Sequence, residues 1–303
     1  MARKFHTLDV FTDTPYAGNA LAVVPDANGL GGEDMQRIAR EFNLSETVFI
    51  LPPENTAHSA RVRIFTPGRE LPFAGHPTVG TAILLALQKA GDIDHEEDAI
   101  IVLEEGVGPV RVGVRLMPGV APFAEFDVPM LPEDGPAAAP NDRLAAALGL
   151  APNDIGFENH TPTQYSAGVP FTFVPVHDLD AISRAAPQIQ HWREAFGDHD
   201  HPNAFVYCRQ TVHKDAAFHA RMFAPLMGIP EDPATGAAVA AFAGVVFRFD
   251  EPPDGIHPGV VEQGYEMGRA SNIFQELEVA GGKLSKVRIG GHAVPVSEGT
   301  FED

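Results

Sequence analysis

The feature that most constrains the fold is a short internal repeat of strand, proline and loop. The segment "ARVRIFTP" at 60–67 resembles "FHARMFAP" at 218–225, and each copy is followed by an irregular loop and a helix start rich in Pro, Thr and Gly. The matched residues are Arg63 with Arg221, Phe65 with Phe223, and Pro67 with Pro225. This shared order predicts two similar α+β lobes with a cleft between them.

The two helix starts are "AGHPTVGTA" and "EDPATGAAVAA". A helix start presents unpaired backbone N–H groups and the positive end of the helix dipole. Pro77 suits a first helical position and Thr235 suits an N-cap, while Gly75 and Gly236 would let a ligand approach the backbone closely. Two such starts facing one another would hold a small anion such as a carboxylate.

A plainer interpretation stays open at this point, because Pro and Thr are common helix caps that need no ligand. His76 and Asp232 add one ionisable group to each start, which favours a functional site. The sequence leaves the register of the two starts uncertain by a residue or two.

The 303 residues carry a formal net charge of −20, which argues against nucleic acid and anionic membranes as partners. Cys208 is the single cysteine, so no internal disulfide can form, and its apolar surroundings predict a buried, inert thiol. The first residues lack the apolar core of a signal peptide, and no apolar run could span a bilayer. We therefore expect a cytoplasmic protein.

A stretch rich in Pro, Ala and Gly, "VPMLPEDGPAAAPND", separates two strand-rich halves. We expect an N-terminal lobe over residues 1–128 and a C-terminal lobe over 129–303, with the last strands able to cross back to the first lobe. The central helices are expected over about 77–90 and 236–247.

Two further groups of polar residues are candidates for a functional site. Glu46, in "NLSETVFI", lies between a helix end and a strand, where a carboxylate could serve as a proton-transfer base or simply be a solvated or capping residue. The histidine-rich run holds His191, Asp198, His199, Asp200 and His201, but its spacing matches no zinc signature. We therefore expect no metal site there.

Five segments together resemble the phenazine-biosynthesis isomerase family (PhzF-like). They occur in the family's order and extend over nearly the whole chain: "LDVFTDTPYAGNALAVV", "NLSETVFI", "RIFTPGRELPFAGHPTVGTA", "EDPATGAA" and "QGYEMGRAS". The resemblance implies a diaminopimelate epimerase-like α+β fold, with two pseudo-symmetric lobes that each wrap a barrel-like, mostly antiparallel sheet around a central helix. It also implies a homodimer, and catalysis without cofactor or metal.

The resemblance assigns site residues as well. It implies catalytic roles for Glu46, His76 and Asp232, with Glu46 as general acid/base in proton transfer within a small carboxylate-bearing substrate. That substrate is expected to resemble dihydro-hydroxyanthranilate. The substrate-binding positions implied are Asn19, Ser45, Gly75, Gly236 and Ala237.

Two departures qualify this picture. The helix starts "PFAGH" and "DPATG" contain no cysteine, so two-base stereoinversion by thiols is not expected. Ala237 stands where many family members have a serine, which removes one hydroxyl from the second helix start. The alternative function is that of a non-catalytic protein that retains the fold and binds a small molecule or interacts with a partner.

Overall fold

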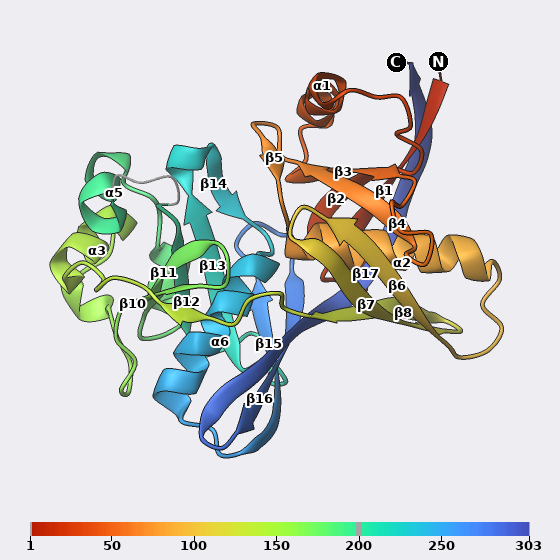
Figure 1. The fold of residues 1–303 in the computed structure, drawn as a ribbon. Helices are drawn as coiled ribbons and strands as arrows, with labels where there is room; N and C mark the ends of the chain where they lie inside the picture. The colour runs from red at the N-terminus through yellow and green to blue at the C-terminus, as the bar shows by residue number, and fades with distance from the viewer. Residues whose placement is uncertain (1, 198–201, 303) are drawn as a thin grey trace. The chain divides into compact units, whose positions relative to one another are not determined.

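A computed structural model describes residues 2–197 and 202–302 of the chain. It divides into two compact units, which are described separately below (Figure 1). Unit 1 comprises residues 1–129 together with 290–303, and unit 2 comprises residues 130–289. The C-terminal residues from 290 onward thus belong to the same compact unit as the N-terminus.

Unit 1 contains a sheet and two helices, α1 (Gly32–Phe42) and α2 (Gly75–Ala90). Its strands are β1 (Ala2–Val10), β2 (Asn19–Val24), β3 (Glu46–Leu51), β4 (Ala60–Phe65), β5 (Glu70–Leu71), β6 (Glu97–Glu105), β7 (Gly108–Met117), β8 (Val120–Asp127) and the end of β17 (Lys283–Glu302). The sheet closes into a barrel, because β1 pairs with β17 and β17 with β8 after the sequence of neighbours β1–β2–β3–β4–β6–β7–β8.

Helix α2 is the centre of this barrel. Most of its residues are buried, and it packs against β1, β2, β3, β6, β7 and β8. A helix that is apolar on all sides is stable only inside a core. Gly80 permits the close packing, because a Cβ atom there would lie 2.6 Å from a methyl of Leu21 and 2.8 Å from one of Val10. Gly91 ends the helix with a positive φ of 68°, as the sequence predicts.

Unit 2 also builds a sheet around a helix, α6 (Gly236–Asp250). Its strands are β9 (Glu133–Asp134), β10 (Thr163–Ser166), β11 (Pro170–Pro175), β12 (Ala204–Cys208), β13 (Phe218–Ala224), β14 (Ile229–Asp232), β15 (Gly255–Gln263) and β16 (Ser271–Ala280). Neighbouring strands follow the order β9–β10–β11–β12–β13–β15–β16, with β14 paired to β13.

An aromatic core joins α6 to this sheet. The ring of Phe242 lies 4.7 to 5.6 Å, centroid to centroid, from the rings of Phe173, Phe205, Tyr207 and Phe218. Such offset and edge-to-face pairs add specific contacts to the burial of apolar area. The core therefore fixes α6 against β11, β12 and β13.

The remaining helices of unit 2 enclose a second apolar cluster. They are α3 (Asn141–Leu148), α4 (Leu179–Arg184) and α5 (Ile189–Phe196), with 3-10 turns η1 (Pro152–Asp154) and η2 (Pro225–Met227). Trp192 lies fully buried in this cluster, and its indole N–H donates to the carbonyl of Pro202 at 2.7 Å. None of the described helices is long and apolar enough to cross a membrane.

The two units repeat the same arrangement of strands. β2 is parallel to β3, β3 antiparallel to β4, and β4 parallel to β6; in unit 2 the same relations join β11, β12, β13 and β15. The matched residues Arg63 and Arg221 lie on β4 and β13, and each forms a bidentate ion pair with a glutamate, Glu70 and Glu231 respectively. The internal repeat predicted from the sequence is confirmed.

The strand register also resolves the alignment of the two helix starts. Ile64 of β4 pairs with Leu71, and Met222 of β13 pairs with Asp232. Leu71 and Asp232 each stand four positions before the first helical glycine, Gly75 and Gly236, so the two starts match without a gap. This register removes the uncertainty that the sequence leaves: Asp232 matches Leu71, and His76 matches Ala237.

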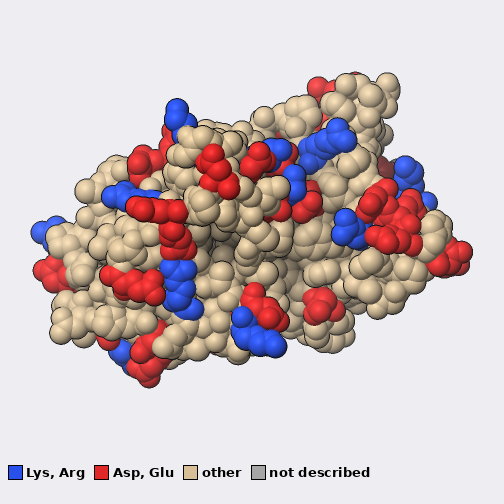
Figure 2. All heavy atoms as spheres, turned by 90° about the horizontal axis from the view of Figure 1, so that it is seen from below, with Lys and Arg blue, Asp and Glu red and all other residues tan. Residues whose placement is uncertain are grey.

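Acidic side chains outnumber basic ones, 41 to 21, which gives the net charge of −20. Figure 2 shows one face, on which Lys and Arg side chains are interspersed with Asp, Glu and uncharged residues.

Candidate functional site

Glu46 begins the strand that runs beside β2. Asn43 caps the C-terminal end of helix α1 in a left-handed backbone conformation (φ 50°). Ser45 lies in the turn that follows, and Glu46 is the first residue of β3. Glu46 pairs in parallel register with Leu21 of β2, close to Asn19, which is the buried first residue of that strand. The side chain of Glu46 is 15 % exposed, so its carboxylate is partly withdrawn from water.

His76 is the ionisable group beside Glu46. It is the second residue of α2, and its Nδ1 lies 3.3 Å from Oε2 of Glu46. Burial lowers the pKa of His76 to about 3, although a hydrogen bond with the backbone of Ala20 acts in the opposite direction. The imidazole is therefore neutral near pH 7, and its contact with Glu46 joins a carboxylate to an uncharged ring.

The first turn of α2 offers two backbone donors. Gly75 and His76 have N–H groups without an intrahelical acceptor. Pro77 has no N–H, and the N–H of Thr78 donates to the carbonyl of Ala74. Pro77 is thus the third helical residue rather than the first, because the helix begins at Gly75. The capacity to bind an anion is concentrated at Gly75 and His76.

A buried carboxyl group lies beneath this first turn. Oε1 of Glu105, the last residue of β6, is 2.8 Å from the hydroxyl of Thr78. Burial raises the pKa of Glu105 to about 8, and the hydrogen bond with Thr78 only partly offsets this effect. A pKa of about 8 favours the neutral carboxylic acid near pH 7. Sequence analysis did not identify Glu105 as a candidate.

The start of α6 is organised around a buried glutamine. Thr235 occupies the N-cap position, as predicted, but its hydroxyl donates to Oδ2 of Asp232 at 2.6 Å instead of capping a helix amide. Gln263, fully buried at the end of β15, accepts a hydrogen bond from the N–H of Thr235 and donates to the carbonyl of Asp232. The amides left for a ligand are those of Gly236 and Ala237.

The structure thus places the predicted site residues in two groups. Asn19, Ser45, Glu46, Gly75 and His76 belong to unit 1, around the start of α2. The other three, Asp232, Gly236 and Ala237, lie at the start of α6 in unit 2. Within unit 1 the predicted catalytic pair, Glu46 and His76, is in contact. The functional roles of all these residues remain predictions.

The other sequence candidates lie elsewhere. Cys208 is buried in β12, and burial raises the pKa of its thiol to about 12. His191 lies on α5, whereas Asp198, His199, Asp200 and His201 fall outside the described residues. Within residues 2–197 and 202–302, no group of three or more His, Cys, Asp and Glu is arranged to hold a metal ion.

Comparisons with known proteins bear on this fold and site. The family model described as "Phenazine biosynthesis-like protein" matches residues 8–299. An uncharacterized isomerase of Mesorhizobium japonicum is 53% identical over 300 residues, which cover 98% of each chain. The trans-2,3-dihydro-3-hydroxyanthranilate isomerase of Pseudomonas aeruginosa is 34% identical over 300 residues, again 98% of each chain. A solved PhzF-family structure from Bacillus anthracis has a TM-score of 0.88 at 28% identity and covers both chains fully.

The fold and these relatives define an isomerase of the diaminopimelate epimerase-like class, as the sequence predicts. The chain belongs to the phenazine biosynthesis-like (PhzF) family. Since its single cysteine is buried in a strand, the two-cysteine route of the epimerases is excluded.

Proposed function

We propose that this isomerase moves a proton between two carbon atoms of a small, cyclic, carboxylate-bearing substrate. The substrate would resemble trans-2,3-dihydro-3-hydroxyanthranilate, on which the Pseudomonas aeruginosa relative acts by name. Glu46 would be the general acid/base, and no cofactor would take part. The observation that carries the proposal is the contact of the Glu46 carboxylate with a buried, neutral imidazole at the start of the central helix.

The proton transfer can be written with Glu46 alone. The carboxylate takes a proton from one carbon, and the electron pair of that C–H bond joins the conjugated system of the substrate. The resulting carboxylic acid then returns the proton to another carbon of the same system. Nothing is gained or lost, so the product is an isomer. Side chains positioned for such transfers contribute about 10²- to 10⁴-fold to the rate.

His76 would support this cycle without changing its own charge. A neutral imidazole puts no positive charge beside the carboxylate, so it does not oppose the uptake of a proton by Glu46. It can also donate or accept a hydrogen bond as the carboxyl group alternates between its two forms. The 3.3 Å separation of His76 Nδ1 and Glu46 Oε2 is close enough for this exchange to follow a small rotation of either side chain.

The helix starts would bind the substrate. Backbone amides of Gly75 and His76 suit a carboxylate or the negative charge that develops during proton transfer, because the helix dipole and fixed N–H groups both favour an anion. We assign the amides of Gly236 and Ala237, with the Asp232 carboxylate, to the remaining polar groups of the substrate. Ala237 offers no hydroxyl, so its contribution would come from the backbone alone.

Turnover of trans-2,3-dihydro-3-hydroxyanthranilate and of a panel of small cyclic carboxylates would test the proposal. Glu46→Gln keeps the size of the side chain but removes the base, so kcat should fall by about 10²- to 10⁴-fold. Carboxylates that bind should still raise the melting temperature of this variant. Glu41→Gln, on an exposed position of α1, is the matched control and should retain full activity. Wild-type turnover by Glu46→Gln would contradict the assignment.

We further propose that the enzyme is a homodimer that works in the cytoplasm. The homodimer follows from the family resemblance, and the cytoplasmic location is consistent with the single, buried, unpaired cysteine. Light scattering at micromolar concentration should give twice the mass of the 32.4 kDa chain, and a monomer mass would refute the dimer.

A further inference from the structure

The internal repeat extends to a pair of acidic strand ends. Ala60 of β4 pairs with Leu103 of β6, and Phe218 of β13 pairs with Val261 of β15. Since the matched arginines put Ala60 and Phe218 at equivalent positions, "LEEG" at 103–106 matches "VEQG" at 261–264. Glu104 is therefore the counterpart of Glu262. The next two positions match as well: Glu105 with Gln263, and Gly106 with Gly264.

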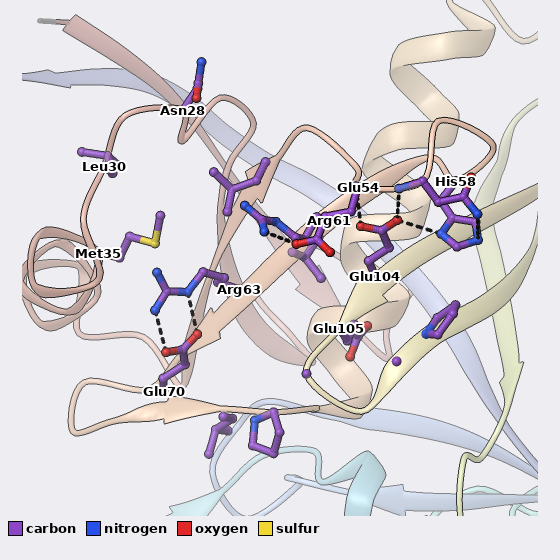
Figure 3. A pocket seen from close by; sticks show the side chains of 18 of the residues that line it. Asn28, Leu30, Met35, Glu54, His58, Arg61, Arg63, Glu70, Glu104 and Glu105 are labelled. Carbon is purple, nitrogen blue, oxygen red and sulfur yellow. Dashed lines mark hydrogen bonds and ion pairs between the residues drawn. The ribbon is translucent and has the colours of Figure 1, made fainter.

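Glu104 and Glu262 behave as counterparts. Glu104 accepts hydrogen bonds from the backbone N–H groups of Glu54 and Asn55, and one of its oxygens lies 2.8 Å from Nδ1 of His58 (Figure 3). Glu262 is bound in the same way. It accepts hydrogen bonds from the backbone N–H groups of Val212 and His213, and one of its oxygens lies 2.7 Å from Nδ1 of His219.

The glycines match equally well. A Cβ atom on Gly106 would lie 2.8 Å from the Cα atom of Pro72, and one on Gly264 would lie 2.6 Å from the carbonyl oxygen of Pro233. Pro72 and Pro233 occupy equivalent positions three residues before the first glycine of α2 and α6. In both units the strand end thus packs directly beneath the segment that leads into the central helix.

Between these matched residues, Glu105 takes the position of Gln263. Gln263 uses both ends of its amide: Oε1 accepts from the N–H of Thr235 at 3.1 Å, and Nε2 donates to the carbonyl of Asp232 at 2.7 Å and to the hydroxyl of Thr235 at 3.1 Å. It therefore supplies both an acceptor and a donor group to the start of α6. A carboxylate offers only acceptors, whereas a carboxylic acid offers one of each.

The hydrogen bond of Glu105 also calls for a donor. The hydroxyl of Thr78 is 2.8 Å from the carbonyl of Ala74 and 2.8 Å from Oε1 of Glu105, and its single hydrogen can serve only one of them. A protonated Glu105 removes the conflict, because it donates to the hydroxyl while Thr78 donates to Ala74. Glu105 is 8 % exposed, and its Oε2 is buried without a hydrogen-bond partner. A buried oxygen without a hydrogen-bond partner costs much free energy in a carboxylate and much less in a neutral carboxylic acid.

We propose that Glu105 is a positioning residue for the start of α2: in its neutral form it supports Gly75 and His76 as Gln263 supports the start of α6. Its ionisation would remove the donor to the Thr78 hydroxyl, which would then have to choose between Glu105 and the carbonyl of Ala74, and this would disturb the first turn of the helix. The inference has two halves. The functional half, that Glu105 positions Gly75 and His76 for catalysis, rests on the proposed function. The structural half, that Glu105 is a neutral acid, does not.

The surroundings of Glu105 provide no described cation to stabilise its ionised form. On β4, Arg61 and Arg63 are paired with Glu54 and Glu70 (Figure 3). The ionisable groups nearest in the fold are otherwise Glu104 on β6, whose oxygens bind the 54–58 loop, Glu46 on β3, and the neutral His76 on α2. Burial is accordingly the main cause of the raised pKa of Glu105, about 8, and Thr78 only opposes it.

The stability of three proteins across pH 4 to 9.5 tests the structural half. A folded state that retains a proton up to about pH 8, while the unfolded state releases it near pH 4.5, loses stability as the pH rises between these values. Over this interval the wild type should lose more stability than Glu105→Gln, because the variant lacks the contribution of this carboxyl group. The mirror variant Gln263→Glu should show an additional loss of the same kind. Equal pH dependence in wild type and Glu105→Gln would overturn the inference.

Activity tests the positioning half. Above pH 8 the wild-type kcat/KM should fall by about tenfold per pH unit, whereas that of Glu105→Gln should remain level. Glu105→Ala, which cannot support the helix, should be slower at every pH. An alkaline fall that persists in Glu105→Gln would refute the positioning role even if the stability result held. If neither Glu105→Gln nor Glu105→Ala folds, ¹³C-carboxyl NMR of the wild type tests the protonation of Glu105 directly. Titration of Glu105 near pH 4.5 would overturn the proposal, and titration near pH 8 would support it.

Discussion

His219 in unit 2 should make the stability of the protein depend on pH over a defined interval. The imidazole is 1 % exposed, with Nδ1 2.7 Å from Glu262 and Nε2 3.0 Å from Glu266. These two carboxylates raise the pKa of His219 to about 9 despite the opposing effect of burial. Folding therefore strengthens the binding of one proton to this residue.

The sign and the size of the effect follow from linkage. Below pH 6.5 both the folded and the unfolded states carry the proton, and the full stabilisation is present. As the pH rises from 6.5 to about 9, only the folded state keeps the proton, so stability is lost across this interval. At about 1.36 kcal/mol for each pH unit, the loss amounts to ~3 kcal/mol.

Urea denaturation followed by Trp192 fluorescence would measure this effect, because the single tryptophan is buried in the same unit as His219. The free energy of unfolding of His219→Gln should lie below that of the wild type at pH 6, and the difference should shrink by ~3 kcal/mol by pH 9.5. His177→Gln, at an exposed position of the same unit, is the control. A difference that stays constant with pH would refute the assignment of a charged, doubly paired His219.

Two further predictions concern packing and reactivity. Phe242→Ala should lower the free energy of unfolding by about 3–5 kcal/mol, since the ring contacts four other aromatic residues; a loss below 1 kcal/mol by urea denaturation would show that the aromatic core is not tightly packed. Cys208 should resist iodoacetamide in the native protein at pH 8 and react in concentrated guanidinium chloride, because burial both shields the sulfur and raises the pKa of the thiol to about 12; mass spectrometry that finds rapid native labelling would contradict this.

The sequence was most informative where regular structure determines the pattern. The repeat around Arg63 and Arg221 predicted two lobes with central helices, and the observed helices begin at Gly75 and Gly236. Strand alternation and runs of small apolar residues carry that information directly. The second helix runs to Asp250, three residues beyond the predicted end.

The alignment of the two helix starts required the strand register. Loop residues follow no periodicity, so the sequence alone left this alignment uncertain by a residue or two. The pairing of Ile64 with Leu71 and of Met222 with Asp232 resolves it.

Glu105 was missed for a related reason. A glutamate at the end of an amphipathic strand is usually solvated. The available signal was the similarity of "LEEG" to "VEQG" at the same distance from the repeated arginines. That similarity is too short to be significant without the parallel pairing of β4 with β6 and of β13 with β15.

The central claim, that Glu46 transfers the proton, is tested most directly by turnover in D₂O. With trans-2,3-dihydro-3-hydroxyanthranilate as substrate, ¹H and ²H NMR should detect deuterium on carbon in the presence of the wild type and of the exposed-site control Glu41→Gln. Glu46→Gln, confirmed as folded by circular dichroism, should give no incorporation above the uncatalysed rate. Incorporation by Glu46→Gln at the wild-type rate would contradict the claim.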